Sequence, residues 1–299
     1  MNRPFNNVGV VGAGHMGAQI VLRCATYGYA VKLMDTSDET LQKAKAFHDS
    51  EMTACVEAGS KTEAEKNSIL GLISYRPGMD GELSGLDLVI ESVPEVLAIK
   101  KQVFAQLDDQ CLPQAILASN SSSMPVSMFE DATNRLDKVL NTHFYTPVAE
   151  RPIVDLMGGT KTTTQTMETM RSFAMSIEIT PLMVKVESMG FIFNRVWRAI
   201  KRECLHLVDE GVSTPDDVDR AWMIALDKTI GPFGMMDMVG LDVVENIESI
   251  YYEKSGNEAD RPPKILLDMI AKGDLGQKSG KGFYDYPDPA YQDPSWLKG

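Results

Sequence analysis

Residues 8–17 read VGVVGAGHMG and decide the fold class of this 299-residue chain. A short apolar run, predicted to be a strand, leads directly into the pattern G-x-G-x-x-G formed by Gly12, Gly14 and Gly17, and a helical pattern follows over residues 16–27. In this context the glycines permit a tight turn, a close approach of the backbone to a pyrophosphate, and close packing of helix on strand. Because the first amide groups of the helix then face the phosphates, the stretch predicts a dinucleotide-binding unit.

A carboxylate ends the next predicted strand, which spans residues 30–34. Asp35 stands there, where it can accept hydrogen bonds from the ribose hydroxyls of a dinucleotide and would repel a 2′-phosphate. No arginine follows within residues 36–38, so the sequence favours NAD over NADP. We also expect Met16 and His15, inside the glycine turn, at the cofactor; the alternative for His15 is a solvated turn residue.

The first half of the chain alternates short apolar runs with helical patterns. Further strands are predicted at residues 86–93, 115–118, 139–144 and 153–157. Near-continuous apolar strands separated by helices are typical of a parallel sheet covered on both faces. Residues 39–72 are charged and rich in alanine, and they predict two helices outside the simple alternation. We therefore predict an α/β fold with a Rossmann-like, doubly wound and mostly parallel sheet.

The last third of the chain has a helical pattern, with no convincing strand until residues 282–284. Apolar residues recur at helical spacing between Phe191 and Val208, which predicts one long amphipathic helix. Thr214 then has the features of an N-cap, with a proline at the first helical position behind it. We predict an α/β domain over residues 1–186 and an all-helical C-terminal domain over residues 187–299, in line with about 150 residues per domain.

The composition excludes several classes of function. Lys and Arg number 29 against 42 Asp and Glu, a net charge of −13, so the chain lacks the basic footprint of a nucleic-acid-binding protein. No apolar run approaches the ~18 residues of a membrane span. The four cysteines include no CxxC pair, which argues against a zinc site or a disulfide framework. Reduced thiols, and a strand pattern that leaves no room for a signal peptide, predict a cytoplasmic protein.

The chain has four histidines, and one of them stands where chemistry is expected. His48 lies in a charged helical segment and is expected to be solvated. His206 follows Glu203 in a Glu-x-x-His pattern, but a di-iron site needs a second copy that the chain lacks, so no metal site is predicted. His143 ends an apolar predicted strand late in the sheet. Doubly wound sheets bind ligands at the carboxyl ends of their strands, so we expect His143 in the active site.

Other polar positions are predicted to lie around His143. Residues 119–123 (SNSSS) follow another apolar strand, so the serine hydroxyls should face the same crevice and Asn120 should reach the cofactor. Asp155 lies on the next predicted strand, and Asn194 lies near the start of the long helix. A base, a carboxylate partner and neutral donors around a nicotinamide are what the oxidation of an alcohol by hydride transfer requires.

These residues predict an NAD-dependent oxidoreductase that acts on a small-molecule hydroxy compound. His143 would take the hydroxyl proton while the adjacent carbon gives up a hydride. Asp155 would hold the imidazole and stabilise the imidazolium that forms. Ser122 and Asn194 would position the substrate oxygen.

Motifs along nearly the whole chain make it similar to the 3-hydroxyacyl-CoA dehydrogenase family, especially to short bacterial 3-hydroxybutyryl-CoA dehydrogenases. They are residues 9–17, 87–95 (DLVIESVPE), 119–123, 143–147 (HFYTP, where the family has His-Phe-Phe-Asn-Pro), 190–195 (GFIFNR), 231–233, 240–242 and 280–284 (GKGFY). The resemblance implies NAD as cofactor, an acyl-CoA substrate, fatty acid metabolism, and a homodimer formed by the helical domain. It also implies that His143 is the catalytic base, that Ser122 and Asn194 contact the substrate, and that Glu95 and Lys100 lie near the cofactor.

The chain departs from the family pattern near the expected chemistry. The family's catalytic glutamate falls on Asp155, whose carboxylate is set back by roughly 1.5 Å, enough to break a hydrogen bond to histidine unless the backbone compensates. Thr146 takes the place of the family's asparagine. Ala58 and Ser60 take the places of two lysines that are common in the family within the helical segment of residues 39–72. In the family, this segment carries basic contacts to CoA phosphates.

Three functions remain open on this evidence. The first is oxidoreduction of a 3-hydroxyacyl-CoA. The second is a dehydrogenase of a 3-hydroxy acid without CoA, of the L-gulonate or carnitine dehydrogenase type. The two missing lysines and the net charge of −13 favour this function. The third is an NAD-binding relative with little turnover, which would follow if Asp155 failed to reach His143.

Overall fold

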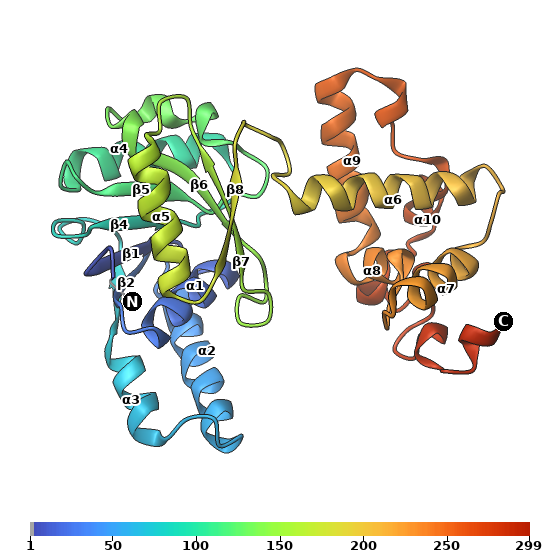
Figure 1. Ribbon diagram of the computed structural model, residues 1–299, viewed down its shortest axis with the longest axis horizontal. Helices are drawn as coiled ribbons and strands as arrows, with labels where there is room; N and C mark the ends of the chain where they lie inside the picture. The colour runs from blue at the N-terminus through green and yellow to red at the C-terminus, as the bar shows by residue number, and fades with distance from the viewer. Residues whose placement is uncertain (1–2) are drawn as a thin grey trace. The chain divides into compact units, whose positions relative to one another are not determined.

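The computed structural model describes residues 3–299, which fold into two compact units that meet in the chain between Ile192 and Phe193 (Figure 1). The first unit combines strands and helices, and the second is helical. No helix within residues 3–299 is long and apolar enough to cross a membrane. In the same range, no group of three histidine, cysteine, aspartate or glutamate side chains is arranged to hold a metal ion.

An eight-stranded sheet forms the centre of the first unit, in the order β3-β2-β1-β4-β5-β6-β7-β8. Its strands are β1 (Asn7–Val11), β2 (Ala30–Asp35), β3 (Ile73–Pro77), β4 (Leu88–Glu91), β5 (Ile116–Ser119), β6 (Val139–Phe144), β7 (Ile153–Gly158) and β8 (Thr180–Val184). Strands β1 to β6 are parallel, β7 pairs antiparallel with β6, and β8 is parallel to β7. The predicted Rossmann-like, mostly parallel sheet is confirmed. Its strand order reverses between β1 and β4, where doubly wound sheets bind ligands.

Two strands of the sheet lie outside the predicted set. Strands β3 and β8 are the two edge strands, and most of their side chains are only partly buried. The sequence of β3 contains Ser74 and Arg76, and that of β8 contains Pro181, which argues against a central strand, so neither segment has the pattern of the central strands. The predicted pair of helices before β3 is present as α2 (Asp38–Glu57) and α3 (Glu63–Gly71).

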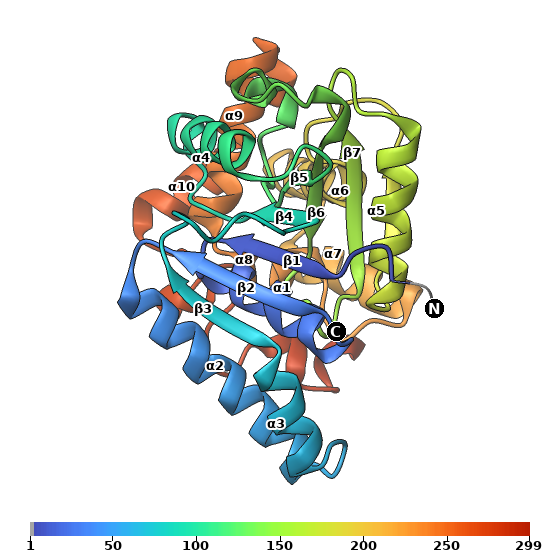
Figure 2. The ribbon, with the colours of Figure 1, turned by 90° about the vertical axis from the view of Figure 1, so that its left-hand side faces the viewer.

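Helices cover both faces of the sheet (Figure 2). On one face, α1 (His15–Thr26), α2 and α5 (Thr164–Ser176) pack on a core that includes Val10, Ile90 and Phe173. On the other face, α4 (Leu97–Gln110) packs on a core that includes Val89 and Phe104. Adjacent residues of β4 thus point to opposite faces and are buried on both, which explains its continuous apolar sequence.

Two of the glycines in residues 12–17, Gly12 and Gly17, lie so close to other backbone atoms that no side chain would fit. Gly12 has a φ of 101°, a conformation that favours glycine, and a Cβ there would collide with the carbonyl of Ser92. A Cβ at Gly17 would collide with the carbonyl oxygen of Gly12. Both glycines are therefore needed for the strand, the turn and α1 to pack at this distance.

The second unit consists of five helices and the segments that join them. They are α6 (Phe193–Asp209), α7 (Pro215–Leu226), α8 (Pro232–Val239), α9 (Leu241–Ser255) and α10 (Lys264–Lys272). Their apolar faces share a core that includes Phe233, Leu241, Leu266 and Tyr284. The Thr214 side chain accepts a hydrogen bond from the backbone N–H of Asp217, as expected for an N-cap.

The start of the long helix differs from the prediction. Helix α6 begins at Phe193, whereas Phe191 lies before it with a φ of 52° and belongs to the first unit. The apolar spacing is misleading here because Phe191 is buried against the side chain of His143 and not on the apolar face of α6. Short 3-10 turns complete the two units, at Val126–Met128, Glu130–Ala132, Leu136–Lys138, Glu258–Asp260, Gln277–Ser279, Ala290–Gln292 and Trp296–Lys298.

Candidate active site

The carboxyl ends of strands β1, β4, β5 and β6 form one edge of the sheet, here called the carboxyl edge. Ser92, after β4, donates its backbone N–H to the Val11 carbonyl at 2.7 Å, and Asn120, after β5, donates to the Glu91 carbonyl at 2.8 Å. These bonds tie successive strand ends together. The glycine turn after β1 and His143 near the end of β6 therefore lie along the same edge.

The glycine turn has the form that a pyrophosphate requires. A Cβ at Gly14 would meet no atom within 4 Å, so the turn opens onto space at this residue. His15 and Met16 form the first turn of α1, with His15 exposed and Met16 half-buried. The Asp35 carboxylate accepts hydrogen bonds from the backbone N–H groups of Ala13, at 2.7 Å, and Ser37, at 2.8 Å. Because a carboxylate has about four acceptor sites, Asp35 keeps capacity for ribose hydroxyls.

His15 is held by a small network rather than standing alone in solvent. Its Nε2 lies 2.9 Å from Oγ1 of Thr146 and 2.8 Å from Nε2 of Gln19. The Gln19 Oε1 accepts a hydrogen bond from the backbone N–H of Val148, so its amide nitrogen must donate toward His15. His15 Nε2 is then an acceptor, and the ring proton is assigned to Nδ1. The network connects the glycine turn to the segment that follows β6.

A buried lysine gathers two carboxylates at the carboxyl edge. Lys100 Nζ lies 2.8 Å from Glu91 Oε1 and 3.0 Å from Glu95 Oε2, with the lysine fully buried. Glu95 also accepts hydrogen bonds from the hydroxyls of Ser121, at 2.5 Å, and Ser123, at 2.8 Å. Burial opposes the charge of Glu95, but these hydrogen bonds and the Lys100 charge outweigh it and lower the pKa of Glu95 to about 2. Glu95 therefore stays ionised at the edge.

Glu91 belongs to this cluster, although the sequence analysis did not single it out. It accepts a hydrogen bond from the Ser119 hydroxyl at 2.6 Å and is fully buried. A charged residue that ends an apolar strand is the signal that could have indicated it, because a carboxylate is buried only with partners.

The side chains of residues 120–123, which follow β5, have different partners. The Asn120 Oδ1 accepts a hydrogen bond from the backbone N–H of Phe144 at 2.9 Å and so joins the ends of β5 and β6. Ser121 and Ser123 hold Glu95. Ser122 is exposed, so its hydroxyl faces outward where a substrate group could reach it.

His143 and Asp155 lie directly opposite each other on β6 and β7. The His143 Nδ1 lies 3.2 Å from the Asp155 Oδ2, and both side chains are buried. The shorter aspartate therefore does reach the histidine. Directly opposed residues of an antiparallel pair have Cβ atoms only about 4.5–5.5 Å apart, which leaves little distance for the side chains to span.

Two aromatic residues that the sequence analysis assigned no role complete the surroundings of His143. The Phe191 ring stacks on the imidazole, with centroids 4.9 Å apart and an interplanar angle of 6°. The Tyr145 ring meets the imidazole at 65° with centroids 4.7 Å apart, and its hydroxyl donates to Asp155 Oδ2 at 2.5 Å. The sequence signal for Tyr145 was a tyrosine where the family pattern has phenylalanine. Phe191 gave no such signal, because its positive φ is visible only in the structure.

Two family models match this chain. One is described as 3-hydroxyacyl-CoA dehydrogenase, NAD binding domain, and matches residues 7–187; the other is described as 3-hydroxyacyl-CoA dehydrogenase, C-terminal domain, and matches residues 190–286. The chain belongs to the 3-hydroxyacyl-CoA dehydrogenase family. It is thus an NAD-dependent oxidoreductase with NAD as its cofactor, as the sequence predicted.

Relatives of this dehydrogenase carry more than one kind of substrate in their names. A 3-hydroxybutyryl-CoA dehydrogenase of Clostridioides difficile is 33% identical over 93% of this chain and 98% of its own length. A 5-formyl-3-hydroxy-2-methylpyridine 4-carboxylate 5-dehydrogenase of Mesorhizobium japonicum is 30% identical over 94% of this chain and 91% of its own length. Among solved structures, an (S)-3-hydroxybutyryl-CoA dehydrogenase from Ralstonia eutropha has a TM-score of 0.89 at 31% identity, covering 95% of this chain and 100% of its own.

The remaining histidines of the dehydrogenase lie away from this edge or in the other unit. The prediction of a solvated His48 is wrong, because the residue is fully buried, with Nδ1 2.7 Å from the Tyr75 hydroxyl and Nε2 2.8 Å from the Ala18 carbonyl oxygen. Burial lowers the pKa of His48. Its charged sequence neighbours occupy the outer face of α2, which hides the inward direction of this one position. His206 and Asn194 lie on α6 in the helical unit.

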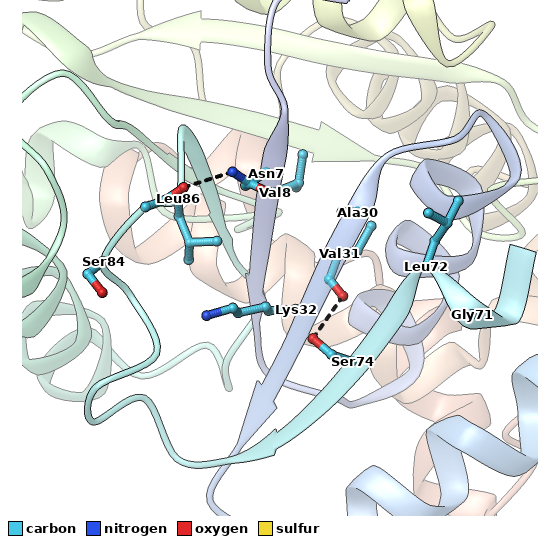
Figure 3. A pocket seen from close by; sticks show the side chains of 11 residues that line it. Asn7, Val8, Ala30, Val31, Lys32, Gly71, Leu72, Ser74, Ser84 and Leu86 are labelled. Atoms are coloured by element: carbon cyan, nitrogen blue, oxygen red, sulfur yellow. Dashed lines mark hydrogen bonds between the residues drawn. The ribbon is translucent and has the colours of Figure 1, made fainter.

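A cavity of about 430 Å³ lies at the edge of the sheet opposite the carboxyl edge. Figure 3 shows the side chains that line it. Its lining includes Asn7, Ala30 and Ser74, from the amino ends of β1, β2 and β3. Lys32 also lines it, but its Nζ is bound to the carbonyl and carboxylate oxygens of Glu82, at 2.8 and 3.0 Å. The glycine turn and Asp35 stand at the carboxyl ends of these strands, so this cavity is not the cofactor site.

Proposed function

We propose that this dehydrogenase interconverts a 3-hydroxyacyl-CoA and the corresponding 3-ketoacyl-CoA, with His143 as the catalytic base. The observation that supports it best is the contact of 3.2 Å between His143 Nδ1 and Asp155 Oδ2 at the same sheet edge as the glycine turn. NAD, when bound, accepts the hydride from the substrate carbon.

In this proposal the two ring nitrogens of His143 have different tasks. Asp155 engages Nδ1, so Nε2 is the atom left to take the proton of the substrate hydroxyl. The buried carboxylate stabilises the imidazolium that forms, and proton transfer of this kind contributes roughly 10²–10⁴-fold to a rate. Ser122 and Asn194 position the substrate oxygen.

The cofactor would be held by the first unit. The proposed contacts are Gly12, Gly14, His15, Met16, Gly17 and Asp35 in and beside the turn, and Glu95, Lys100 and Asn120 along the carboxyl edge. We assign cofactor binding to a domain over residues 1–186. We assign substrate binding and dimerisation to a domain over residues 187–299. Large apolar side chains exposed on the helical unit, such as Val196, Val212 and Ile224, support a homodimer. A role in cytoplasmic fatty acid metabolism completes the proposal.

Purified protein tests the proposal directly. The expected result is oxidation of NADH when acetoacetyl-CoA is added, and loss of that activity in His143→Gln but not in the matched His206→Gln, which changes a histidine of the other unit. Full activity in His143→Gln would contradict the assigned base. Tight NADH binding without turnover of any hydroxy or keto substrate would instead indicate a binding protein.

A dehydrogenase of a 3-hydroxy acid without CoA is the second candidate. The loss of lysines from residues 39–72 favours it. Ala58 and Ser60 carry no charge, and Lys66 is already bound to Asp49, at 2.8 Å, and to Thr53, at 2.7 Å. The other lysines of residues 39–72 are Lys43, which pairs with Glu39 at 2.6 Å, Lys45 and Lys61. Activity with acetoacetate or other free keto acids, and none with acetoacetyl-CoA, would establish this alternative.

A further inference from the structure

We propose that Tyr145 is a positioning residue of this dehydrogenase, whose hydroxyl holds the Asp155 carboxylate in the place from which it pairs with His143. The inference rests on the proposed function, in which His143 is the base. It adds a member to the catalytic machinery that acts through Asp155 and not on the substrate.

Both partners of Asp155 converge on one carboxylate oxygen. Oδ2 accepts the Tyr145 hydroxyl at 2.5 Å and lies 3.2 Å from His143 Nδ1. The other oxygen, Oδ1, is buried and has no hydrogen-bond partner among residues 3–299. Of the two contacts, the one to tyrosine is the shorter, so tyrosine does most to fix the direction of the carboxylate.

The short side chain makes such a guide necessary. The strand register sets Asp155 opposite His143, but it fixes only the backbone, and the carboxylate can still turn about its side-chain bonds. A glutamate would reach roughly 1.5 Å farther toward the imidazole. An aspartate has no such reserve of length, so a rotation away from His143 would lose the contact.

The packing around the imidazole isolates the hydroxyl as the active part of Tyr145. Its ring already meets the edge of His143, and Phe191 covers the ring face. All three side chains are buried. Tyr145→Phe therefore keeps the ring in contact with His143 and removes the hydroxyl that donates to Asp155.

The aspartate and the tyrosine should act as a pair, and a double-mutant cycle tests this. We expect Tyr145→Phe to lower kcat about tenfold, as for loss of a hydrogen bond to a charged group, with little change in KM. The acid limb of its kcat profile should move to lower pH, because the imidazolium loses its carboxylate partner. We expect Asp155→Glu alone to lose several-fold, because the longer carboxylate meets the tyrosine hydroxyl, and Tyr145→Phe/Asp155→Glu to recover most of the wild-type kcat.

A matched control is Tyr29→Phe. Tyr29 is a buried tyrosine of the same unit whose hydroxyl lies 2.6 Å from that of Ser176, away from the carboxyl edge. It should lose stability to a similar degree without changing kcat or its pH profile. Independent effects in the cycle, in which the double variant shows the product of the two single losses, would overturn the proposal.

A spectroscopic readout separates this proposal from the proposed function. The chain has four histidines, so comparison with His143→Gln identifies the proton NMR signal of the hydrogen-bonded His143 Nδ1–H. The signal should be present in the wild type and in the double variant and absent in Tyr145→Phe. If it behaves so in a protein that turns over no hydroxyacyl substrate, only the proposed function fails. If it persists in Tyr145→Phe with kcat unchanged, the positioning role fails.

Discussion

Each unit of the molecule buries an aspartate completely, and the two are satisfied in different ways. Asp155, in the sheet unit, has two side chains as partners and one oxygen without any among residues 3–299. Asp219, in the helical unit, uses both oxygens, on the backbone N–H groups of Phe233 and Gly234 and on the Tyr284 hydroxyl. A carboxylate saturated by backbone holds the chain in place, whereas one held by side chains can respond to a change of charge beside it.

The helical unit repeats the backbone arrangement at Asp237. This carboxylate accepts the backbone N–H groups of Phe283 and Tyr284, each at 3.0 Å. A Cβ at Gly282 would collide with it, as one at Gly231 would collide with Asp219. Gly231 and Gly282 are thus required by two buried aspartates: Asp219 ties the start of α8 to α7, and Asp237 ties residues 283–284 to α8.

The largest expected effect is a loss of activity when the partner of Asp155 is removed. His143→Gln should lower kcat by roughly 10²–10⁴-fold, because it removes the proposed base that Asp155 supports. NADH affinity, measured by fluorescence titration, should stay close to that of the wild type. A large loss of NADH binding would show that the sheet edge depends on this pair for its structure, and the contrast with Asp219 would disappear.

Asp219→Ala should have the opposite profile. It leaves two buried N–H groups and a tyrosine hydroxyl without their acceptor, so we expect the free energy of unfolding to fall by about 3 kcal/mol. All three tryptophans, Trp197, Trp222 and Trp296, lie in the helical unit, so their fluorescence in urea reports its unfolding. Asp217→Ala on the same helix is the control, since its exposed carboxylate pairs with Arg220 at the surface. Equal midpoints for the two variants would be evidence against a structural role for Asp219.

The pH dependence sharpens the comparison further. Burial, opposed by its hydrogen bonds, raises the pKa of Asp219 from 3.8 to about 6. The folded state then binds the proton more tightly than the unfolded state, so this contribution to stability is complete below about pH 3.8 and is lost as the pH rises through about 6. Between pH 7.5 and pH 5 the helical unit should gain about 1 kcal/mol from this group, and Asp219→Asn should lose that dependence.

The sheet unit responds in the other direction. The lowered pKa of Glu95, about 2 against 4.5, gives stability that is present above about pH 4.5 and is lost as the pH falls toward 2. Tryptophan fluorescence for the helical unit and NADH binding for the sheet unit follow the two trends separately. A gain of stability in the sheet unit as the pH falls from 4.5 toward 2 would contradict the distinction drawn between the two carboxylates.

The smallest expected effect concerns His15, which neutral side chains hold. His15→Ala should weaken NADH binding about fivefold, as for the loss of one hydrogen bond of about 1 kcal/mol at an exposed site, and leave kcat unchanged. Thr146→Val should act in the same direction, and Thr146→Ser, which keeps the hydroxyl, should not. Unchanged NADH affinity in all three variants would mean that His15 does not contact the cofactor.

The parts of the fold that the sequence predicts are those governed by local rules. The glycine turn, the apolar strands and the Thr214 cap have short signals that neighbours in sequence determine. Edge strands β3 and β8, the burial of His48 and the contact of Phe191 with His143 depend on what packs against them from distant parts of the chain. The resemblance implies only that Glu95 and Lys100 lie near the cofactor, whereas the contacts of Lys100 with both Glu95 and Glu91 depend on the packing of α4 against the strand ends.

The register of β6 with β7 has a consequence for engineering. His143 and Asp155 face each other because two extended strands are paired, and the connection between these strands does not set their separation. The exposed tip of that connection, residues 149–152, can therefore be lengthened or exchanged while the pair keeps its geometry. New loops grafted there would vary what approaches the histidine without rebuilding the His143–Asp155 pair.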